Sequence, residues 1–220
     1  MGKPPCLLLH GFTGGTDELE PLARELERCG RSCVLPLLPW NGRKLGEGGR
    51  VHWKDWVEAA EEEARNLERQ QTSFDVVGFS MGGLLAAYMA TKYRVRRLVL
   101  LNAAVIYISP ARFARELTMR LRQGDRGHLE KMGGTPLQAT WQFTRLVKHM
   151  RPELRKVKVP TLIAQSELDQ VVHPFSARYV HSKLQGPKEL HTFPRSNHLI
   201  CQGPDAPELF RVVERFLAAD

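Results

Sequence analysis

The chain has 220 residues, of which 42% are hydrophobic and 25% charged, a composition typical of one globular domain with a sizeable core. No apolar run approaches the roughly 20 residues that a membrane-spanning helix needs, and the apolar stretch at 7–9 is too short for a signal peptide. We therefore expect a cytoplasmic protein. The formal net charge is +8, and we expect no nucleic acid partner. Neither glycine-rich motif of nucleotide-binding proteins occurs, so we also expect no bound nucleotide.

Short apolar runs alternate with helical patterns along most of the chain. The strand candidates are the six runs 5–9, 32–35, 74–78, 97–102, 161–165 and 188–193, and several of them are short, continuous and apolar, as expected for strands buried on both faces. Helices are predicted over 17–29, 53–69, 174–184 and 206–218, the first with Asp17 and Glu20 at capping-box spacing. The alternation indicates the α/β class: a mostly parallel sheet of about six strands with helices on both faces.

One segment breaks this alternation. Between Asn102 and the next predicted strand lie about sixty residues, for which we predict helices at 111–122, 127–131 and 136–150. We expect the region 104–158 to form a small helical cap within a single domain, 1–220, above the carboxyl ends of the strands. Residues 111–158 contain twelve basic and four acidic residues. A solvated face is the simpler interpretation of this charge. The alternative is that it attracts anionic substrates, lipid surfaces (in transient contact) or nucleic acid.

The predicted strand 74–78 runs directly into the pentapeptide Gly78-Phe79-Ser80-Met81-Gly82, which opens a helical segment. A serine in such a Gly-x-Ser-x-Gly motif sits on a tight turn with its hydroxyl exposed, and small residues on both sides give it room. A chance match is the alternative for so short a motif, but its place between a strand and a helix argues against chance. We predict Ser80 as a nucleophile.

A serine hydroxyl needs a neighbouring base to take its proton and a third group to orient that base. In this type of turn the acid and the histidine follow the serine in the chain. Asp169 comes after the run 161–165, and His198 comes after the run 188–193. Both are therefore expected at the carboxyl edge of the sheet, beside Ser80.

Other residues compete for these two roles. Glu167 lies two residues before Asp169 and is the alternative acid. His173 and His191 are the alternative bases, but His191 falls inside a predicted strand and His173 directly precedes a helix. The position of His198 after the last strand favours it as the base.

Acyl transfer also needs two backbone N–H donors for the oxyanion of its tetrahedral intermediate. The amide of Met81, directly after the nucleophile, is one candidate, and the amide of Phe12, in the loop after the first strand, is the other. We expect His10 to brace that loop. Phe12, Trp40 and Met81 are also expected to line the substrate pocket, and the reaction requires no metal or cofactor.

With these residues placed, the chain resembles the α/β-hydrolase superfamily, and more narrowly the small bacterial carboxylesterases and monoacylglycerol lipases. The resemblance covers essentially the whole chain. It rests on His-Gly-Phe-Thr-Gly at 10–14, Asp55-Trp56 opening a helix, Gly-x-Ser-Met-Gly-Gly at 78–83, Asp-x-x-Val at 169–172 and Asn-His at 197–198. It implies an α/β-hydrolase fold and a serine hydrolase that cleaves short-to-medium-chain acyl esters or monoacylglycerols through Ser80, Asp169 and His198.

The chain departs from this family in three places. It begins at the strand before the oxyanion loop, so the first two strands of the fuller fold are expected to be absent. Residues 38–43 read Leu-Pro-Trp-Asn-Gly-Arg where many relatives have Gly-His-Gly, and no glycine stands before the acid. Fold alone does not exclude a thioesterase, a peptidase or a carbon–carbon hydrolase on the same triad. A non-catalytic protein that holds an anionic partner on its basic cap is the remaining alternative.

The four cysteines, Cys6, Cys29, Cys33 and Cys201, show neither a CxxC pair nor the histidine spacing of a zinc site. Cys6 and Cys33 fall in apolar, strand-like runs, where a free thiol behaves as a small hydrophobic group. We expect four buried structural thiols. The sequence does not predict an oligomeric state.

Overall fold

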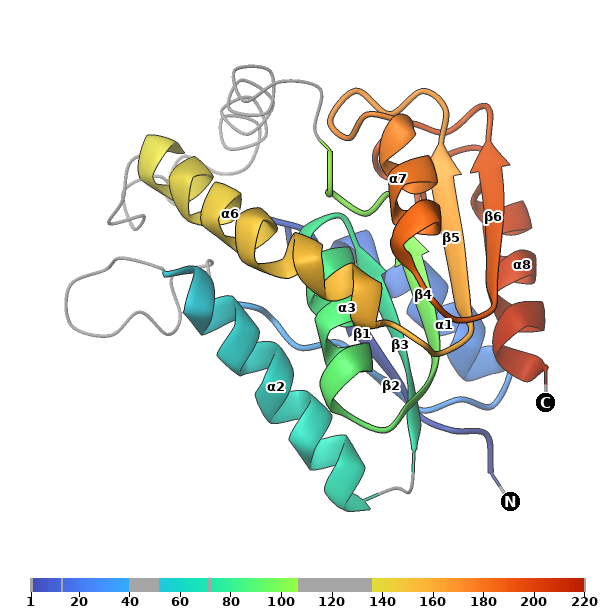
Figure 1. Ribbon diagram of the computed structural model, residues 1–220. Helices are drawn as coiled ribbons and strands as arrows, with labels where there is room; N and C mark the ends of the chain where they lie inside the picture. The colour runs from blue at the N-terminus through green and yellow to red at the C-terminus, as the bar shows by residue number, and fades with distance from the viewer. Residues whose placement is uncertain (1, 13, 40–51, 71–72, 107–135, 220) are drawn as a thin grey trace, which may run out of the picture.

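The computed structural model describes residues 2–12, 14–39, 52–70, 73–106 and 136–219. Six parallel strands form one sheet in the order β2-β1-β3-β4-β5-β6 (Figure 1). The strands are β1 (Cys6–Leu9), β2 (Cys33–Val34), β3 (Phe74–Phe79), β4 (Val95–Leu101), β5 (Thr161–Ser166) and β6 (Lys188–Phe193). The predicted α/β class and six-stranded sheet are confirmed.

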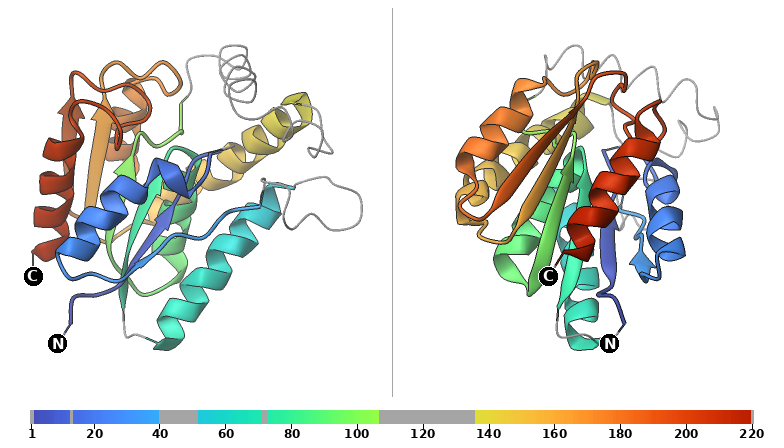
Figure 2. Two further views of the ribbon diagram at one scale, coloured as in Figure 1. Left: turned by 180° about the vertical axis from the view of Figure 1, so that it is seen from behind. Right: turned by 90° about the vertical axis from the view of Figure 1, so that its right-hand side faces the viewer.

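Helices cover both faces of this sheet, as the two views of Figure 2 show. One face carries α1 (Glu20–Arg28) and α8 (Ala206–Ala218), and the other carries α2 (Trp53–Gln70), α3 (Met81–Lys92), α6 (Pro136–Met150) and α7 (Phe175–Lys183). Short 3₁₀ helices, η1 (Thr16–Glu18) and η2 (Arg151–Lys156), precede α1 and follow α6. The fold therefore has three layers, with the sheet between two helical layers.

The period of two along each strand divides the core into two parts. In β1, Leu7 and Leu9 pack against the layer of α2 and α3, whereas Cys6 and Leu8 pack against the layer of α1 and α8. Because side chains alternate across a strand, a strand that is covered on both sides must be apolar throughout. This explains why the central strands appear in the sequence as continuous apolar runs.

Two predicted details of the elements are wrong. The capping box at Asp17 and Glu20 does not form, since α1 begins after Leu19 with no side-chain cap, and Asp17 lies in η1 instead. Strand β4 begins at Val95, two residues before the predicted start, and ends at Leu101. Its end is set by Asn102, whose backbone is left-handed with a φ of 44°.

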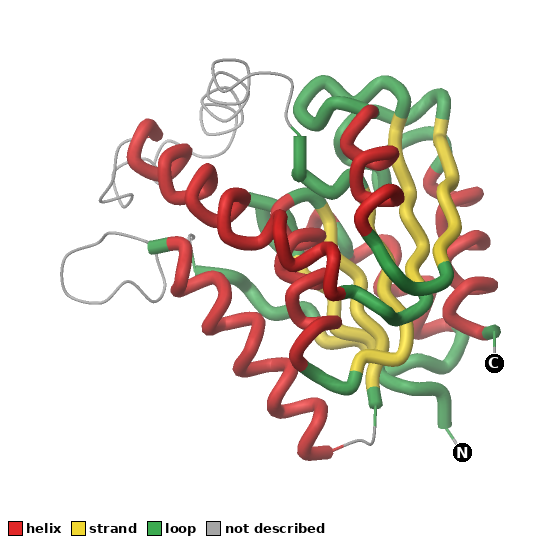
Figure 3. The backbone as a smooth tube through the Cα atoms, in the orientation of Figure 1, coloured by secondary structure: helices red, strands yellow, loops and turns green. Residues whose placement is uncertain are grey.

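The predicted helical insertion is described only in part. The helix at 136–150 is confirmed as α6, which packs against α2 and α3 and lies beside them in Figure 3. The helices predicted at 111–122 and 127–131 lie outside the described residues, so the single domain with a cap at 104–158 stays a prediction. No helix among the described residues is long and apolar enough to span a membrane.

The four cysteines are free thiols, but only two of them are buried. Cys6 and Cys201 lie in the core, and burial raises the pKa of both thiols. Cys29 and Cys33 are only half-buried, which corrects the prediction of four buried thiols, although partial burial still raises the pKa of Cys33 to about 11. A thiol with a raised pKa is a weak nucleophile.

A buried ionic cluster joins the two ends of the chain at the amino edge of the sheet. Asp75 in β3 accepts hydrogen bonds from the guanidinium groups of Arg31, at 2.7 Å, and Arg96, at 2.8 Å. Both arginines also donate to the carbonyl of Leu217, at the end of α8. The last helix is thereby tied to the centre of the sheet, and both chain termini lie at this edge in Figure 1.

Candidate active site

Ser80 lies at the turn between β3 and α3 in an unusual backbone conformation. Its φ is 54° and its ψ is −115°, and its side chain points to the edge at which the strands end. A non-glycine residue with positive φ is strained and persists only where its surroundings hold it. Here the Ser80 amide donates to the carbonyl of Leu101 at 2.9 Å, and the Ser80 carbonyl accepts from the amides of Gly83 and Ala104.

The glycines of the motif are needed because backbone passes directly against them. A Cβ at Gly82 would overlap the carbonyl of Leu9 in β1, and a Cβ at Gly78 would overlap the carbonyl of Gly82. The turn therefore brings three segments into contact: the end of β1, the end of β3 and the start of α3. This is the close approach for which the Gly-x-Ser-x-Gly pattern provides room.

The imidazole of His198 lies between the predicted nucleophile and the predicted acid. Its Nε2 is 3.2 Å from Oγ of Ser80, and its Nδ1 is 2.8 Å from Oδ2 of Asp169. These three side chains come from loops after β3, β5 and β6, and all are buried. The structure therefore brings together the three residues that sequence analysis selected, although the first and the last are separated by more than half of the chain.

The carboxylate of Asp169 sets the tautomer and the orientation of the His198 imidazole. Its Oδ1 accepts the amides of Val171 and Val172, each at 2.8 Å, which holds the carboxylate in one orientation. Its Oδ2 is then an acceptor for Nδ1–H of His198, so the lone pair of the imidazole lies on Nε2, facing the Ser80 hydroxyl. A base so oriented can take the proton of the serine.

The competing residues lie elsewhere. Glu167 has an exposed side chain, and His173 is exposed with its Nδ1 accepting the amide of Phe175. His191 lies in the edge strand β6, where its ring contacts the carboxylate of Glu189 at 3.2 Å. Among the residues that the structure describes, none of the three forms a hydrogen bond or an ion pair with Ser80 or His198, so the geometry favours Asp169 and His198.

The loop after β1 is held from two sides. On one side, His10 donates from Nδ1 to the carbonyl of Gly11 at 2.8 Å and accepts the amide of Leu38 at Nε2, at 3.0 Å. Only a neutral imidazole has one donor and one acceptor, and burial lowers the pKa of His10 accordingly. His10 therefore links this loop to the segment after β2, the bracing position that the sequence predicts.

On the other side of the loop lies the buried carboxylate of Glu18. It accepts the amide of Gly11 at 2.8 Å. A Cβ at Gly14 would overlap this carboxylate, and a Cβ at Gly11 would come within 2.9 Å of its Oε2. The two glycines thus let the loop fold over a carboxylate that accepts one of its N–H groups.

Of the three residues predicted to line the substrate pocket, the structure describes Phe12 and Met81. The ring of Phe12 is buried, stacks on Phe143 of α6 and meets Trp56 of α2 edge-on, each with ring centroids 5.3 Å apart. Met81 is also buried, at the first position of α3. Trp40 lies outside the described residues. In the described part of the chain, no group of three or more His, Cys, Asp or Glu side chains could hold a metal ion.

The family model for the Alpha/beta hydrolase family matches residues 6–211 of the chain. The chain belongs to this family.

Two curated relatives support the assignment along almost the whole length of this alpha/beta hydrolase. A thermostable monoacylglycerol lipase from Bacillus sp. (strain H-257) is 30% identical, over 98% of this chain and 90% of the relative. A carboxylesterase from Bacillus subtilis (strain 168) is 22% identical, over 98% of this chain and 93% of the relative. The family-level resemblance predicted from the sequence is confirmed.

A solved structure supports the fold. It comes from work on LipS and LipT, two metagenome-derived lipolytic enzymes. The two structures superpose with a TM-score of 0.79 at 24% sequence identity, over 99% of this chain and 94% of the other. The agreement over nearly all of both chains shows that this alpha/beta hydrolase keeps the family's arrangement of strands and helices.

Sequence analysis missed two residues that hold the site together. The side chain of Asn102, after β4, donates to the main-chain carbonyl of His198 at 2.8 Å and to Oγ of Ser166 at 3.0 Å. The ring of Phe79 packs against that of His198, with centroids 4.9 Å apart. A polar residue directly after a buried apolar strand was the available signal for Asn102, whereas Phe79 looks like any strand residue.

Proposed function

We propose that this alpha/beta hydrolase is a serine carboxylester hydrolase with Ser80 as nucleophile, His198 as general base and Asp169 as the residue that orients the base. The observation that carries the proposal is the continuous hydrogen-bonded series from Oγ of Ser80 through His198 to Asp169. It begins at a serine held in a strained turn, as nucleophiles in this motif are.

The reaction would take place in two halves. In the first, Ser80 attacks the ester carbonyl while His198 takes the hydroxyl proton, and the same proton then passes to the departing alcohol, leaving an acyl-serine. In the second, water attacks the acyl group, gives its proton to His198, and the acid leaves as Ser80 regains its hydrogen. We assign the oxyanion of both tetrahedral intermediates to the amides of Phe12 and Met81.

The names of the relatives and the surroundings of Phe12 support a proposal for the substrate class. We propose short-to-medium-chain acyl esters or monoacylglycerols, since one relative is a monoacylglycerol lipase and another a carboxylesterase. The rings of Phe12, Trp56 and Phe143 form a buried apolar cluster at the predicted oxyanion loop, which supports an apolar substrate group beside that loop.

The first experiment is covalent labelling of Ser80 by a fluorophosphonate, which reacts only with an activated serine. Wild-type protein should be labelled, and Ser80→Ala and His198→Ala should not, with folding checked by circular dichroism. Failure of the wild type to react would overturn the nucleophile and favour the non-catalytic alternative.

The second experiment separates ester hydrolysis from the related chemistries. We expect turnover of nitrophenyl esters of graded chain length, with slower turnover of a matched thioester and an aminoacyl amide. If every ester is inert while the thioester, the amide or a carbon–carbon substrate is cleaved, the proposed substrate class is wrong but the nucleophile stands.

A further inference from the structure

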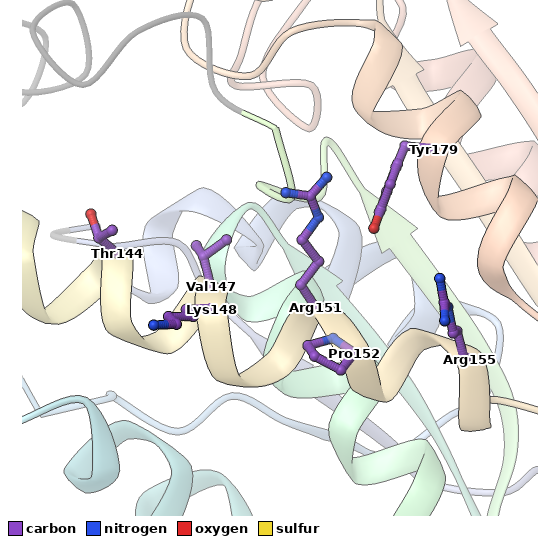
Figure 4. Close-up of a pocket in the computed structure, with 7 residues that line it drawn as sticks. All are labelled: Thr144, Val147, Lys148, Arg151, Pro152, Arg155 and Tyr179. Atoms are coloured by element: carbon purple, nitrogen blue, oxygen red, sulfur yellow. The ribbon is translucent and has the colours of Figure 1, made fainter.

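A groove with a volume of about 470 Å³ lies between α6 with η2 on one side and α7 on the other. Its polar lining consists of Thr144, Lys148, Arg151, Arg155 and Tyr179, and we call it the basic groove. Figure 4 shows Arg151 and Arg155 rising from η2 on the side of Tyr179. None of its lining residues belongs to the hydrogen-bonded series of Ser80, His198 and Asp169, so the basic groove is separate from the proposed active site.

The charges of the basic groove are all of one sign. Its lining holds three cations and no carboxylate. Within the described part of the chain, none of Lys148, Arg151 and Arg155 forms an ion pair, whereas the neighbouring Lys156 pairs with Glu153 at 2.8 Å. Three cations that line one concave surface repel one another, and an anion bound among them would relieve that repulsion.

The three cations of the basic groove come from consecutive helices, α6 and η2. Thr144 and Lys148 lie four residues apart in α6, which places them on a common face, and Arg151 and Arg155 of η2 line the same groove. The opposite face of the same segment is apolar and buried, through residues such as Phe143, Leu146 and Met150. Arg151 and Arg155 are therefore directed away from the core, on the side of Tyr179 and α7 (Figure 4).

Arg151 is held in a fixed position within the basic groove. Its guanidinium lies over the ring of Tyr179, 4.3 Å from the ring centroid, and Nζ of Lys183 lies 5.1 Å from the same centroid. The Nε of Arg151 is buried and has no hydrogen-bond partner among the described residues. A buried N–H without a partner carries a desolvation penalty.

We propose that the basic groove binds phosphomonoester groups. A phosphomonoester dianion carries up to two charges and several strong acceptor oxygens, so it can accept from a planar guanidinium and from other cations at once. The two arginines provide guanidinium groups, Lys148 provides a point charge, and the hydroxyl of Tyr179 provides a further donor. The phosphate could belong to a soluble metabolite or to a lipid headgroup, which share this chemistry.

The soluble arm of the test is a calorimetric titration with inorganic phosphate and with glycerol phosphate at constant ionic strength, against chloride. We expect saturable binding to the wild type, weakened about tenfold in Arg155→Gln and in Arg151→Gln. Arg155 is exposed, so its variant should fold even if Arg151→Gln does not. The matched control is Arg178→Gln, which removes one exposed charge from α7 outside the groove lining and should bind as the wild type does.

The lipid arm compares phosphatidylcholine vesicles that contain phosphatidate with vesicles that contain phosphatidylglycerol at equal charge. Preference for phosphatidate that is lost in Arg155→Gln identifies a lipid headgroup as the source, and soluble binding without it identifies a free phosphomonoester. The proposal is overturned if neither arm shows saturable binding, or if Arg178→Gln weakens binding as much as Arg155→Gln. Ester hydrolysis by Arg155→Gln should match the wild type, so the outcome does not depend on the proposed function.

Discussion

The side-chain amide of Asn102 donates a hydrogen bond to the main-chain carbonyl of His198 at 2.8 Å, joining the end of β4 to the loop after β6. The same side chain accepts the amide of Ser166 at 2.7 Å, at the end of β5. Asn102 therefore connects the ends of β4 and β5 with the loop after β6, and it holds the main chain of His198 in position. No hydrogen bond to the reacting side chains is involved, so Asn102 is a positioning residue.

Replacing Asn102 by glycine should lower kcat about 10–100-fold, since a displacement of about 1 Å at the reacting groups costs this much. Glycine adopts the left-handed φ of 44° freely, so the change removes the side-chain bonds without new backbone strain. We expect KM for a nitrophenyl ester to change little, because substrate contacts are kept. The control is Ser166→Ala, which removes only one partner of Asn102 and should lose much less activity. Equal losses of kcat in the two variants would contradict the positioning role.

Asp169→Asn should lower kcat about 10⁴-fold, because an asparagine cannot both orient the imidazole and stabilise its protonated form. Glu167→Gln is the matched control: it makes the same chemical change two residues away, at an exposed side chain, and should behave as the wild type. Steady-state hydrolysis of a short-chain ester measures both. A nearly normal Asp169→Asn beside an inactive Glu167→Gln would move the acid to Glu167.

Gly82→Ala should destabilise the fold by about 1–3 kcal/mol or more, because the added methyl group overlaps the backbone of β1, which cannot shift without disturbing the sheet. Gly2→Ala serves as the control, since a Cβ there meets nothing within 4 Å. The free energy of unfolding from urea titration measures the difference. A Gly82→Ala variant as stable as the wild type would show that the turn can move away from β1.

The free energy of unfolding should decrease as the pH is lowered, because of His10. Burial lowers the pKa of this histidine from its usual 6.5, so below that pH the unfolded chain takes up a proton that the folded chain does not. The stability is therefore fully present above pH 6.5 and declines as the pH falls below it, by at most about 1.4 kcal/mol per pH unit for one proton.

His10→Gln should be less stable at pH 8, because at least one of the two backbone bonds of the ring is lost, and its stability should vary less between pH 7 and 5. Urea titrations across this range measure the slope. His173→Gln, which replaces an exposed histidine, should keep the wild-type slope. If His10→Gln retains the full slope, the decline comes from another group.

Sequence predicted those parts of the fold that depend on local pattern. The turn at Ser80 is set by glycines that lie next to it in the chain, and Asp169 and His198 follow strands whose apolar composition marks where they end. The start of β4 at Val95 was missed because Arg96, which follows it, looks like a loop residue. In the structure Arg96 pairs with buried Asp75, and the guanidinium of Arg97 lies 5.1 Å from the ring centroid of Phe216.

The residues that support the site could not be predicted in the same way, because their partners are remote in sequence. Asn102 and His198 are 96 residues apart, and their contact depends on the order of strands in the sheet. The partner of Glu18 could not be identified from the sequence, because the amide group from which it accepts belongs to a loop whose shape the sequence does not specify. The basic charge of 111–158 was visible, but the position of Lys148, Arg151 and Arg155 in one groove depends on the packing of η2 against α7.

The ionic cluster of Arg31, Asp75 and Arg96 has a practical consequence for handling the molecule. It anchors the final helix at the edge of the sheet opposite Ser80, and both chain ends emerge there (Figure 1). A tether or a fusion partner attached at either end would project away from the strand ends that carry the triad. The hydrolase could therefore be immobilised on a support, or linked in tandem, with the approach to its serine left clear.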